Sequence, residues 1–230
     1  REKPCRFGSF TTMGEFYVET GLNIIGMSDY KRILSLDSAM AVVQFKKADV
    51  AYQRNYFISY PANVLVMRFS ADRPGKQNLI FSYAPNPVST GSMVAQGDNG
   101  LVYSAALDNN GMKYVVRIQA ETKGGTLVNR NGKLTVKGAD EVVFYVTADT
   151  DYKANFAPDF KNPKTYVGVN PVETTGQWLA NAVAKGYSAL LNEHYQDYAA
   201  LFNRVKLNLN PTVKTCLLYT SDAADDMQCV

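Results

Sequence analysis

The sequence predicts an all-β fold, an antiparallel β-sandwich followed by one C-terminal helix. From about residue 14 to residue 149, short runs rich in β-branched and aromatic residues follow one another without a helical pattern between them. That order favours a sandwich or barrel over an alternating α/β sheet. Turn-forming pairs such as Pro74-Gly75 and Asn131-Gly132 separate the runs. The aromatic residues include 15 tyrosines, which suit half-buried pleated surfaces.

Eight runs have the length and the composition of strands. A further segment, residues 126–136, is predicted to form a hairpin, because Asn131-Gly132 at its centre accepts the positive φ angles of a tight two-residue turn. Together they make up a predicted sandwich domain over residues 1–151. The eight predicted strands are residues 15–19, 40–45, 50–59, 63–69, 79–83, 101–107, 113–120 and 141–147.

The pattern changes after the last predicted strand. Residues 152–176 contain three prolines among polar residues and predict an irregular connection. From Gln177 to Arg204 the apolar period predicts an amphipathic helix with Thr174 or Thr175 as its N-cap. Gly186 inside it is expected to cost about 1 kcal/mol relative to alanine. The apolar positions of this helix are Val183, Tyr187, Leu190, Leu191, His194, Tyr198, Leu201, Phe202 and Val205.

Composition argues against several classes of protein. The formal net charge is +3 and the basic residues are scattered, whereas nucleic-acid-binding proteins usually carry a basic stripe. We expect no membrane helix, because no apolar run has the length to span a bilayer. Cys5, Cys216 and Cys229 form no CxxC pair, and only one histidine accompanies them. A zinc site or a disulfide framework is therefore not expected, and no cofactor is predicted.

Glycoside hydrolysis needs two carboxyl groups across a cleft, one protonated and one ionised. Asp149 and Asp151 are the nearest pair in sequence, just after the last predicted strand. Residues two apart on an extended chain share one face. Aspartates at strand ends are commonly solvated turn residues, and we interpret this pair in that way.

His194 is the only histidine, and Asp197 follows three residues later. A catalytic dyad would also need a nucleophile, and the sequence places none beside them. We interpret His194 as a hydrogen-bonded residue of the packed helix face. Loop aromatics can stack on sugar rings, although they more often hold the loop to its own domain. From the residues alone no catalytic, cofactor-binding or metal-ligating residue is assigned; the loop aromatics in question are Tyr152, Phe156 and Tyr166.

Several stretches resemble the N-terminal region of glycoside hydrolase family 95, whose members are mainly α-L-fucosidases. Residues 30–45 are similar to an early Tyr-x-Arg-x-Leu-x-Leu-Asp segment, and residues 64–75 to a Val-x-Arg-x-x-Ala-Asp-x-Pro-Gly pattern. Residues 194–207, His-Tyr-Gln-Asp-Tyr-Ala-Ala-Leu-Phe-Asn-Arg-Val-Lys-Leu, are the most specific piece, because His-x-x-Asp-Tyr-x-x-Leu-Phe-x-Arg-Val closes the linker helix in that family. The resemblance covers residues 7–210 and departs from the family at residues 10–15.

The resemblance implies a super-sandwich of the galactose-mutarotase-like kind, a helical linker and then a catalytic (α/α)6 barrel. It implies an inverting parent enzyme that removes α-L-fucosyl residues, with its catalytic residues in the barrel, so none is carried over to this chain. The expected partners are that barrel and, for the parent, a fucosylated glycan, with no nucleic acid and no membrane. The habit of the family places the parent in a bacterium, secreted or periplasmic.

The end of the chain departs from the family pattern. Residues 216–226, Cys-Leu-Leu-Tyr-Thr-Ser-Asp-Ala-Ala-Asp-Asp, resemble a translated sequencing adaptor. We therefore expect residues 177–210 to hold the linker helix and the start of the next region. Residues 211–230 are expected to be an artefactual, disordered tail. The truncated chain is expected to be inactive alone. Two alternatives stay open. One is a stand-alone carbohydrate-binding sandwich that uses surface tyrosines; the other is a small complete hydrolase that uses Asp149, Asp151 or His194.

Overall fold

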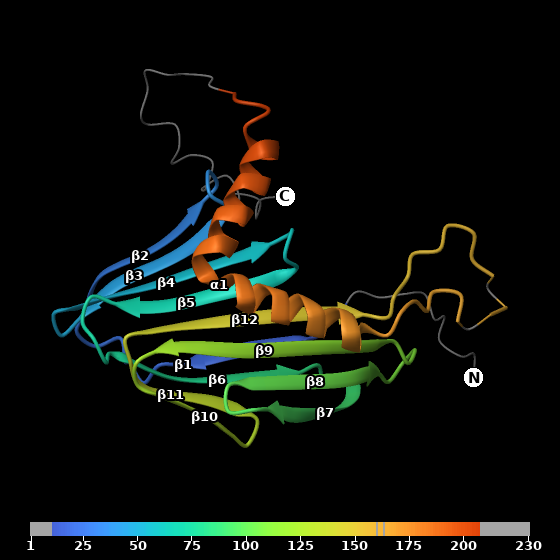
Figure 1. Ribbon diagram of the computed structural model, residues 1–230, viewed down its shortest axis with the longest axis horizontal. Coiled ribbons are helices and arrows are strands. Elements are labelled where there is room, and N and C mark those ends of the chain that lie inside the picture. The colour runs from blue at the N-terminus through green and yellow to red at the C-terminus, as the bar shows by residue number, and fades with distance from the viewer. Residues whose placement is uncertain (1–10, 160, 163, 208–230) are drawn as a thin grey trace, which may run out of the picture.

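The computed structural model describes residues 11–159, 161–162 and 164–207, and it confirms the β-sandwich (Figure 1). Every pair of neighbouring strands is antiparallel. The smaller sheet has the strand order β1 (Gly14–Glu19), β6 (Gln77–Pro85), β11 (Lys133–Ala139), β10 (Thr126–Arg130). The larger sheet has the order β2 (Met27–Ser35), β3 (Met40–Lys47), β4 (Val50–Ser59), β5 (Val64–Ala71), β12 (Glu141–Thr150), β9 (Lys113–Lys123), β8 (Gly100–Leu107), β7 (Ser89–Gln96).

The main core lies between the two sheets. Strand β12 contributes Val142, Phe144 and Val146 to it, because alternate residues of a strand face the same side. Phe81 of β6 meets Phe144 with ring centroids 4.5 Å apart, and neither side chain is accessible to solvent. Burying each such ring contributes about 1.5–3 kcal/mol to stability. This core makes the sandwich the rigid part that positions the helix.

The predicted hairpin is confirmed. Strands β10 and β11 pair in register up to Arg130 and Lys133, so Asn131 and Gly132 form a two-residue turn. Their φ angles are 51° and 70°, the left-handed conformation that such a turn requires at both positions. The sequence signal therefore predicted both the turn and the register of the strands that it joins.

Two strands were not predicted, and both lie at the edges of the larger sheet. Strand β2 is exposed along nearly its whole length, and its pairing with β3 shifts register between Ser28 and Lys31. Strand β7 is also mostly exposed. An edge strand with neither face buried has no alternation of apolar and polar residues, which is the signal that sequence reasoning uses.

The helix α1 (Pro171–Phe202) begins six residues before its predicted start. The predicted N-cap is wrong: Asn170 caps the helix, and its side chain accepts a hydrogen bond from the amide of Val172 at 3.2 Å. Pro171 suits the first helical position because its missing N–H would have no partner there. Thr175 is buried instead, and its hydroxyl donates to the carbonyl of Pro171 at 2.7 Å. The last residues of the predicted irregular connection, 171–176, are thus helical.

Gly186 divides α1 into two halves at a kink. Its φ of 73° and ψ of 168° are not helical, so the expected cost of a glycine inside a regular helix does not apply. The first half lies across β12 and β9, and the second turns away past β4 and β5 (Figure 1). A second apolar cluster joins both halves to the outer face of the larger sheet, with Leu179 and Ala182 from the first half and Leu190 from the second.

No helix in the described part of the chain is long and apolar enough to cross a membrane. The expectations for residues 211–230 and for the three cysteines fall outside the described residues.

Candidate functional site

Asp149 and Asp151 have structural contacts. Asp151 is buried, and its carboxylate accepts a hydrogen bond from the amide of Lys113 at 2.9 Å. Its main chain also bonds both Lys113 and Gly168, so it ties the end of β12 to β9 and to the following loop. Asp149 accepts a hydrogen bond from the neighbouring amide of Thr150 at 2.8 Å. The pair therefore has structural contacts at the end of β12. The interpretation as solvated turn residues is not met in full, because Asp149 lies within β12 and Asp151 is buried.

His194 is buried between the second half of α1 and the turn between β2 and β3. Its Nε2 lies 3.2 Å from the carbonyl oxygen of Ser38 and 3.1 Å from that of Ala39. Because carbonyl oxygens only accept hydrogen bonds, Nε2 carries the proton in this arrangement. The ring also contacts Phe57 with centroids 5.0 Å apart. No hydrogen bond to Asp197 occurs among the described residues, so the structural interpretation of His194 fits better than a dyad.

The loop aromatics divide into two groups. Tyr152 and Tyr166 stack on each other with ring centroids 5.9 Å apart and planes inclined by 16°. An isolated bridge between Tyr152 and Val167 holds the same two segments together, so these tyrosines hold the loop to itself. Phe156 is 99% exposed and makes no such contact. The described residues contain no cluster of three metal-ligating side chains.

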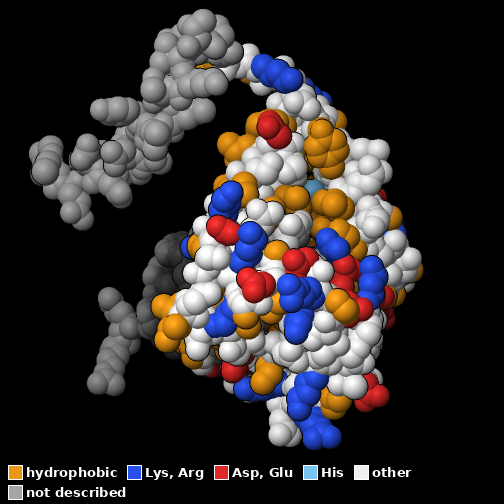
Figure 2. Space-filling view, turned by 90° about the vertical axis from the view of Figure 1, so that its left-hand side faces the viewer, with side chains coloured by type: hydrophobic (Ala, Val, Ile, Leu, Met, Phe, Trp, Pro, Cys, Tyr) orange, Lys and Arg blue, Asp and Glu red, His pale blue; other side chains and the backbone are white. Residues whose placement is uncertain are grey.

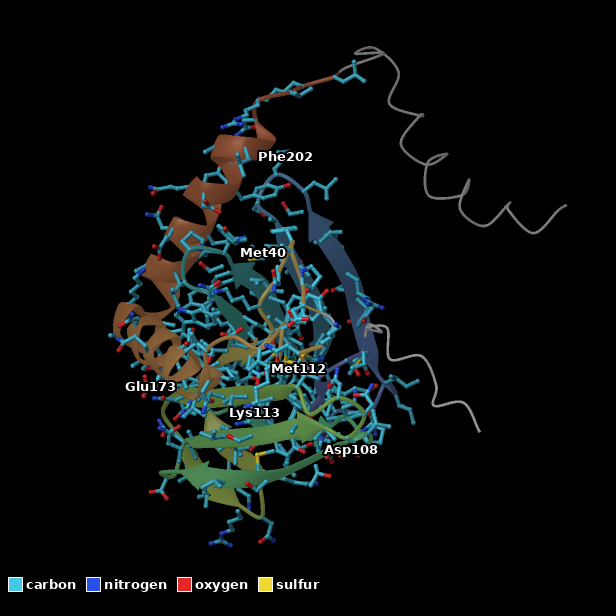
Figure 3. The ribbon with its side chains drawn as sticks, turned by 90° about the vertical axis from the view of Figure 1, so that its right-hand side faces the viewer. Met40, Asp108, Met112, Lys113, Glu173 and Phe202 are labelled. Carbon is cyan, nitrogen blue, oxygen red and sulfur yellow. The ribbon has the colours of Figure 1, made fainter. Side chains whose placement is uncertain are left out.

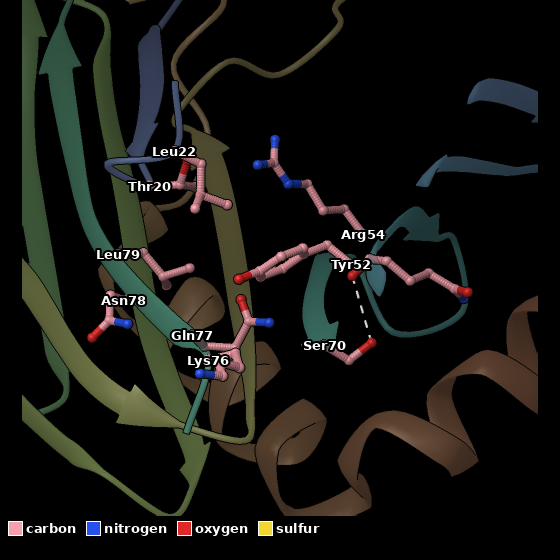
Figure 4. A pocket seen from close by; sticks show the side chains of 10 residues that line it. Thr20, Leu22, Tyr52, Arg54, Ser70, Lys76, Gln77, Asn78 and Leu79 are labelled. Carbon is pink, nitrogen blue, oxygen red and sulfur yellow. Dashed lines mark hydrogen bonds between the residues drawn. The ribbon is translucent and has the colours of Figure 1, made fainter. Parts of the chain in front are cut away.

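A small cavity lies at the open end between the sheets, and Figure 4 shows Tyr52, Arg54 and Gln77 around it. Its volume is about 10 Å³, which is room for one water molecule and too little for a sugar ring. The side-chain Nε2 of Gln77 has no hydrogen-bond partner in the described part of the chain. Arg54 is held above the rings of Phe45 and Phe69 at 5.0 and 5.8 Å.

A row of aromatic side chains leads from the sheet to the end of α1. Phe57 of β4 contacts both Tyr187 and His194, with centroids 5.9 and 5.0 Å apart. His194 is followed by Tyr198 at 6.4 Å, and Tyr198 by Phe202 at 5.0 Å. Residues four apart share one helix face, which explains the row. Figure 3 shows Phe202 at the end of α1 that lies farthest from Glu173.

The free end of α1 carries apolar side chains with little to cover them. Five residues there, which we call the helix-end patch, are each at least 40% exposed. In Figure 2 orange side chains also gather around the pale blue histidine on the face of the helix. Exposed apolar surface of this kind commonly marks a contact with another protein surface. The helix-end patch consists of Tyr195, Leu201, Phe202, Val205 and Leu207.

Below the kink, charged groups from three strands meet on the outer face of the larger sheet. Glu141 bonds Arg68, and its other oxygen lies 3.2 Å from the ammonium group of Lys123. The hydroxyl of Tyr145 donates to Glu121 at 2.8 Å. Sequence reasoning missed these groups because Arg68 and Glu141 are 73 residues apart and only strand pairing brings them together.

The environment of Glu141 fixes its charge. Burial would raise the pKa of its carboxyl group, but hydrogen bonds and charge interactions with Arg68 and Lys123 outweigh burial and lower that pKa. Burial, together with the hydrogen bond to Glu121, raises the pKa of Tyr145. Glu141 therefore stays ionised near neutral pH and does not have the protonated form that a glycosidase general acid needs.

Residues 2–155 match the family described as "Glycosyl hydrolase family 65, N-terminal domain". This chain belongs to that family. The result fits the observed sandwich. The chain is therefore an N-terminal domain of the glycoside hydrolase type. The matching family is family 65, whereas the sequence resemblance was to family 95.

Curated relatives of this family member are named as fucosidases. The chain is 29% identical over 213 residues to "Probable alpha-fucosidase A" of Aspergillus niger, covering 88% of this chain and 26% of the relative. It is 24% identical to "Alpha-L-fucosidase 2" of Arabidopsis thaliana, covering 80% of this chain and 24% of that protein. The chain thus spans about a quarter of the length of these relatives.

A solved structure shares the fold of this family member. It is assigned as a kojibiose phosphorylase from the human microbiome and superposes with a TM-score of 0.52 at 12% sequence identity. The match covers 80% of this chain and 27% of the phosphorylase. At this identity the similarity concerns the fold alone.

Proposed function

We propose that this domain is the non-catalytic N-terminal scaffold of an inverting α-L-fucosidase of the family 95 type. The observation that carries the proposal is the similarity to relatives named as fucosidases, of which this chain spans about a quarter. The remaining length of such a parent would hold the catalytic (α/α)6 barrel. The linker-like stretch over residues 194–207 supports the assignment to family 95. The proposal also places the parent enzyme in the periplasm or outside the cell.

The helix-end patch is the surface on which the scaffold would meet the barrel. It is apolar, and it lies at the end of α1 that leads away from the sandwich (Figure 3). The aromatic row from Phe57 to Phe202 connects it to the core, so a contact made there would be held by the rigid sheet. Burying apolar side chains of this size would contribute about 1.5–3 kcal/mol each.

The experiment compares the 230-residue chain with the full-length protein. Long-read sequencing of the source locus downstream of Pro211 supplies the complete reading frame. We expect the full-length protein to release L-fucose from an α-L-fucoside, with the β-anomer appearing first in the NMR spectrum, and the 230-residue chain to release none. Release of fucose by the 230-residue chain would overturn the scaffold role. Retention of the α-anomer would overturn the inverting mechanism.

Substitutions test the docking surface in the full-length protein. Phe202→Asp and Leu201→Asp should lower its thermal stability and its fucosidase activity, because each places a charge in the proposed contact. Ile25→Asp is the matched control, since Ile25 is 78% exposed in the connection between β1 and β2, outside the helix-end patch. Equal effects of all three substitutions would argue against docking through the helix-end patch.

A further inference from the structure

A groove opens beside the kink of α1, on the outer face of the larger sheet. We call it the kink groove. Its volume is about 740 Å³, within the range of pockets that bind small molecules. One wall is formed by residues 185–188 at the kink of α1, and the floor comes from the adjoining ends of β5, β9 and β12. The charged residues that line it are Arg68, Glu121, Lys123, Glu141 and Lys185, and Tyr145 and Tyr187 are among its other polar residues.

The groove exists because α1 changes direction. Both halves of the helix pack apolar side chains against the sheet, whereas the floor beside the kink also carries charged side chains. Gly186 lines the groove, and a Cβ atom built on it would meet nothing within 4 Å, so this wall faces open space. A sheet face that only served to hold a helix would gain more from apolar residues, since half-buried charges add little to stability.

Each polar side chain of the floor is held in place by another. The hydroxyl of Tyr145, itself fully buried, fixes Glu121 at 2.8 Å. Glu141 is fixed by Arg68 and by Lys123, and the guanidinium group of Arg68 lies 5.0 Å from the ring centre of Tyr187. Groups that are ordered before a ligand arrives lose little conformational entropy when it binds.

Hydrogen-bonding capacity remains on the open side of the groove. Glu121 is exposed, and only one of its carboxylate oxygens takes part in a hydrogen bond within the described residues. The side chain of Lys123 is 74% exposed and pairs with Glu141, so its ammonium group can donate further hydrogen bonds. An acceptor and a donor of full charge therefore flank the same open space.

The charges of the floor limit the kind of ligand. Three cations, Arg68, Lys123 and Lys185, line the groove. Arg68 and Lys123 are balanced by Glu121 and Glu141, and Lys185 is paired with Glu193 at 2.7 Å, so neither an anion nor a cation is favoured overall. A sugar hydroxyl both donates and accepts hydrogen bonds, and hydrogen bonds to charged partners are the stronger ones. Figure 2 shows blue and red side chains interleaved below the helix on this side of the molecule.

The geometry points to the kink groove as a binding site for a neutral saccharide, held by Glu121 and Lys123. The choice of a saccharide among neutral polar ligands rests on the glycoside hydrolase role proposed above. The site would give this domain a recognition function in addition to its role as a scaffold.

The test is an NMR titration of the 230-residue chain with L-fucose, lactose and maltotriose as separate probes. We expect amide signals of Lys123 and of residues 186–188 to shift and to saturate with at least one probe. Added sodium chloride should leave the affinity unchanged, because the ligand carries no net charge. Sulfate should not compete. Competition by sulfate would overturn the assignment to a neutral ligand.

Variants locate the site. Glu121→Gln and Lys123→Ala should each weaken binding about tenfold, the effect expected for the loss of one hydrogen bond to a charged group. Lys113→Ala is the matched control, because Lys113 is an exposed lysine at the opposite end of β9. Ser188→Trp should block the groove while replacing only an exposed residue.

The outcomes are distinct from those of the fucosidase experiment. If no probe shifts these amides, or if Ser188→Trp binds as well as the unaltered chain, the saccharide site is refuted while the scaffold role stands. The dispersion of the amide signals of each variant shows whether it is folded. Binding that persists in both Glu121→Gln and Lys123→Ala would equally contradict the assignment.

Discussion

The imidazole Nε2 of His194 lies 3.1 Å from the main-chain carbonyl oxygen of Ala39, 155 residues earlier in the sequence. The preceding carbonyl, that of Ser38, is 3.2 Å from the same nitrogen. Ala39 has a φ of 47°, so the turn between β2 and β3 has a left-handed residue at this point. One side chain thereby links the second half of α1 to the far end of the larger sheet.

The loss of this link should destabilise the fold. We expect His194→Ala to lower the free energy of unfolding by about 1–3 kcal/mol, because it removes a buried hydrogen bond and the contact with Phe57. Urea unfolding followed by circular dichroism measures the change. Asp197→Ala, three residues away on the helix, should change it by less than about 0.5 kcal/mol. A His194→Ala protein as stable as the unaltered chain would contradict the structural role.

The kink at Gly186 should not tolerate a side chain. Its φ of 73° with ψ of 168° is a conformation that only glycine adopts readily, so Gly186→Ala should cost about 1–3 kcal/mol in the free energy of unfolding. Gly176→Ala in the same helix is the control. Its added Cβ would lie 3.6 Å from the guanidinium group of Arg117, an ordinary contact, and alanine there should stabilise the helix by up to about 1 kcal/mol. Equal effects of Gly186→Ala and Gly176→Ala on the free energy of unfolding would show that stability does not depend on the kink.

The two aspartates at the end of β12, Asp149 and Asp151, should differ in their contribution to stability. Asp151→Ala should lower the free energy of unfolding by about 1–3 kcal/mol, since the amide of Lys113 loses its side-chain acceptor, the buried carboxylate of Asp151. Asp149→Ala, which removes a bond only to the adjacent amide, should cost less than half as much. Thermal unfolding of both variants measures the difference, and a reversed order would argue against the assigned contacts.

The Arg68–Glu141 pair should make stability sensitive to acid. Because the folded-state pKa of Glu141 is lowered, the pair contributes stability above the unfolded pKa near 4.5, and this contribution is lost as the pH falls through the folded pKa. Glu141→Gln should therefore be less stable than the unaltered chain by about 1 kcal/mol at neutral pH. The difference in the free energy of unfolding between Glu141→Gln and the unaltered chain should disappear below pH 4.5. Urea unfolding at neutral and acidic pH tests this, and a gap that widens in acid would contradict the pairing.

The sequence predicted those elements whose residues alternate between a core and solvent. Strand β6 and the Asn131-Gly132 hairpin are examples, because burial and turn geometry leave local patterns. The edge strands β2 and β7 have no buried face and left no such pattern. The helix start was misplaced because Pro171 was one of the three prolines that predicted the irregular connection, although proline is favourable at the first position of a helix.

The charged floor of the kink groove could not be predicted from the sequence. Its side chains come from β5, β9 and β12, which are adjacent only after the sheet has formed. Gly186 was noticed as a glycine within an apolar helix, but the direction in which the chain turns there depends on the packing of Leu190 and His194 against the sheet. The role of His194, by contrast, was inferred correctly from its place on the apolar face.

The position of β12 also determines when the fold can be completed during synthesis. As the last strand made, it lies between β5 and β9, and the larger sheet therefore remains two separate meanders, β2–β5 and β7–β9, until the ribosome has passed residue 150. Pairings that join distant parts of a chain form slowly. Until then the nascent protein has two open strand edges, at β5 and at β9, and chaperones that shield such edges should improve its yield.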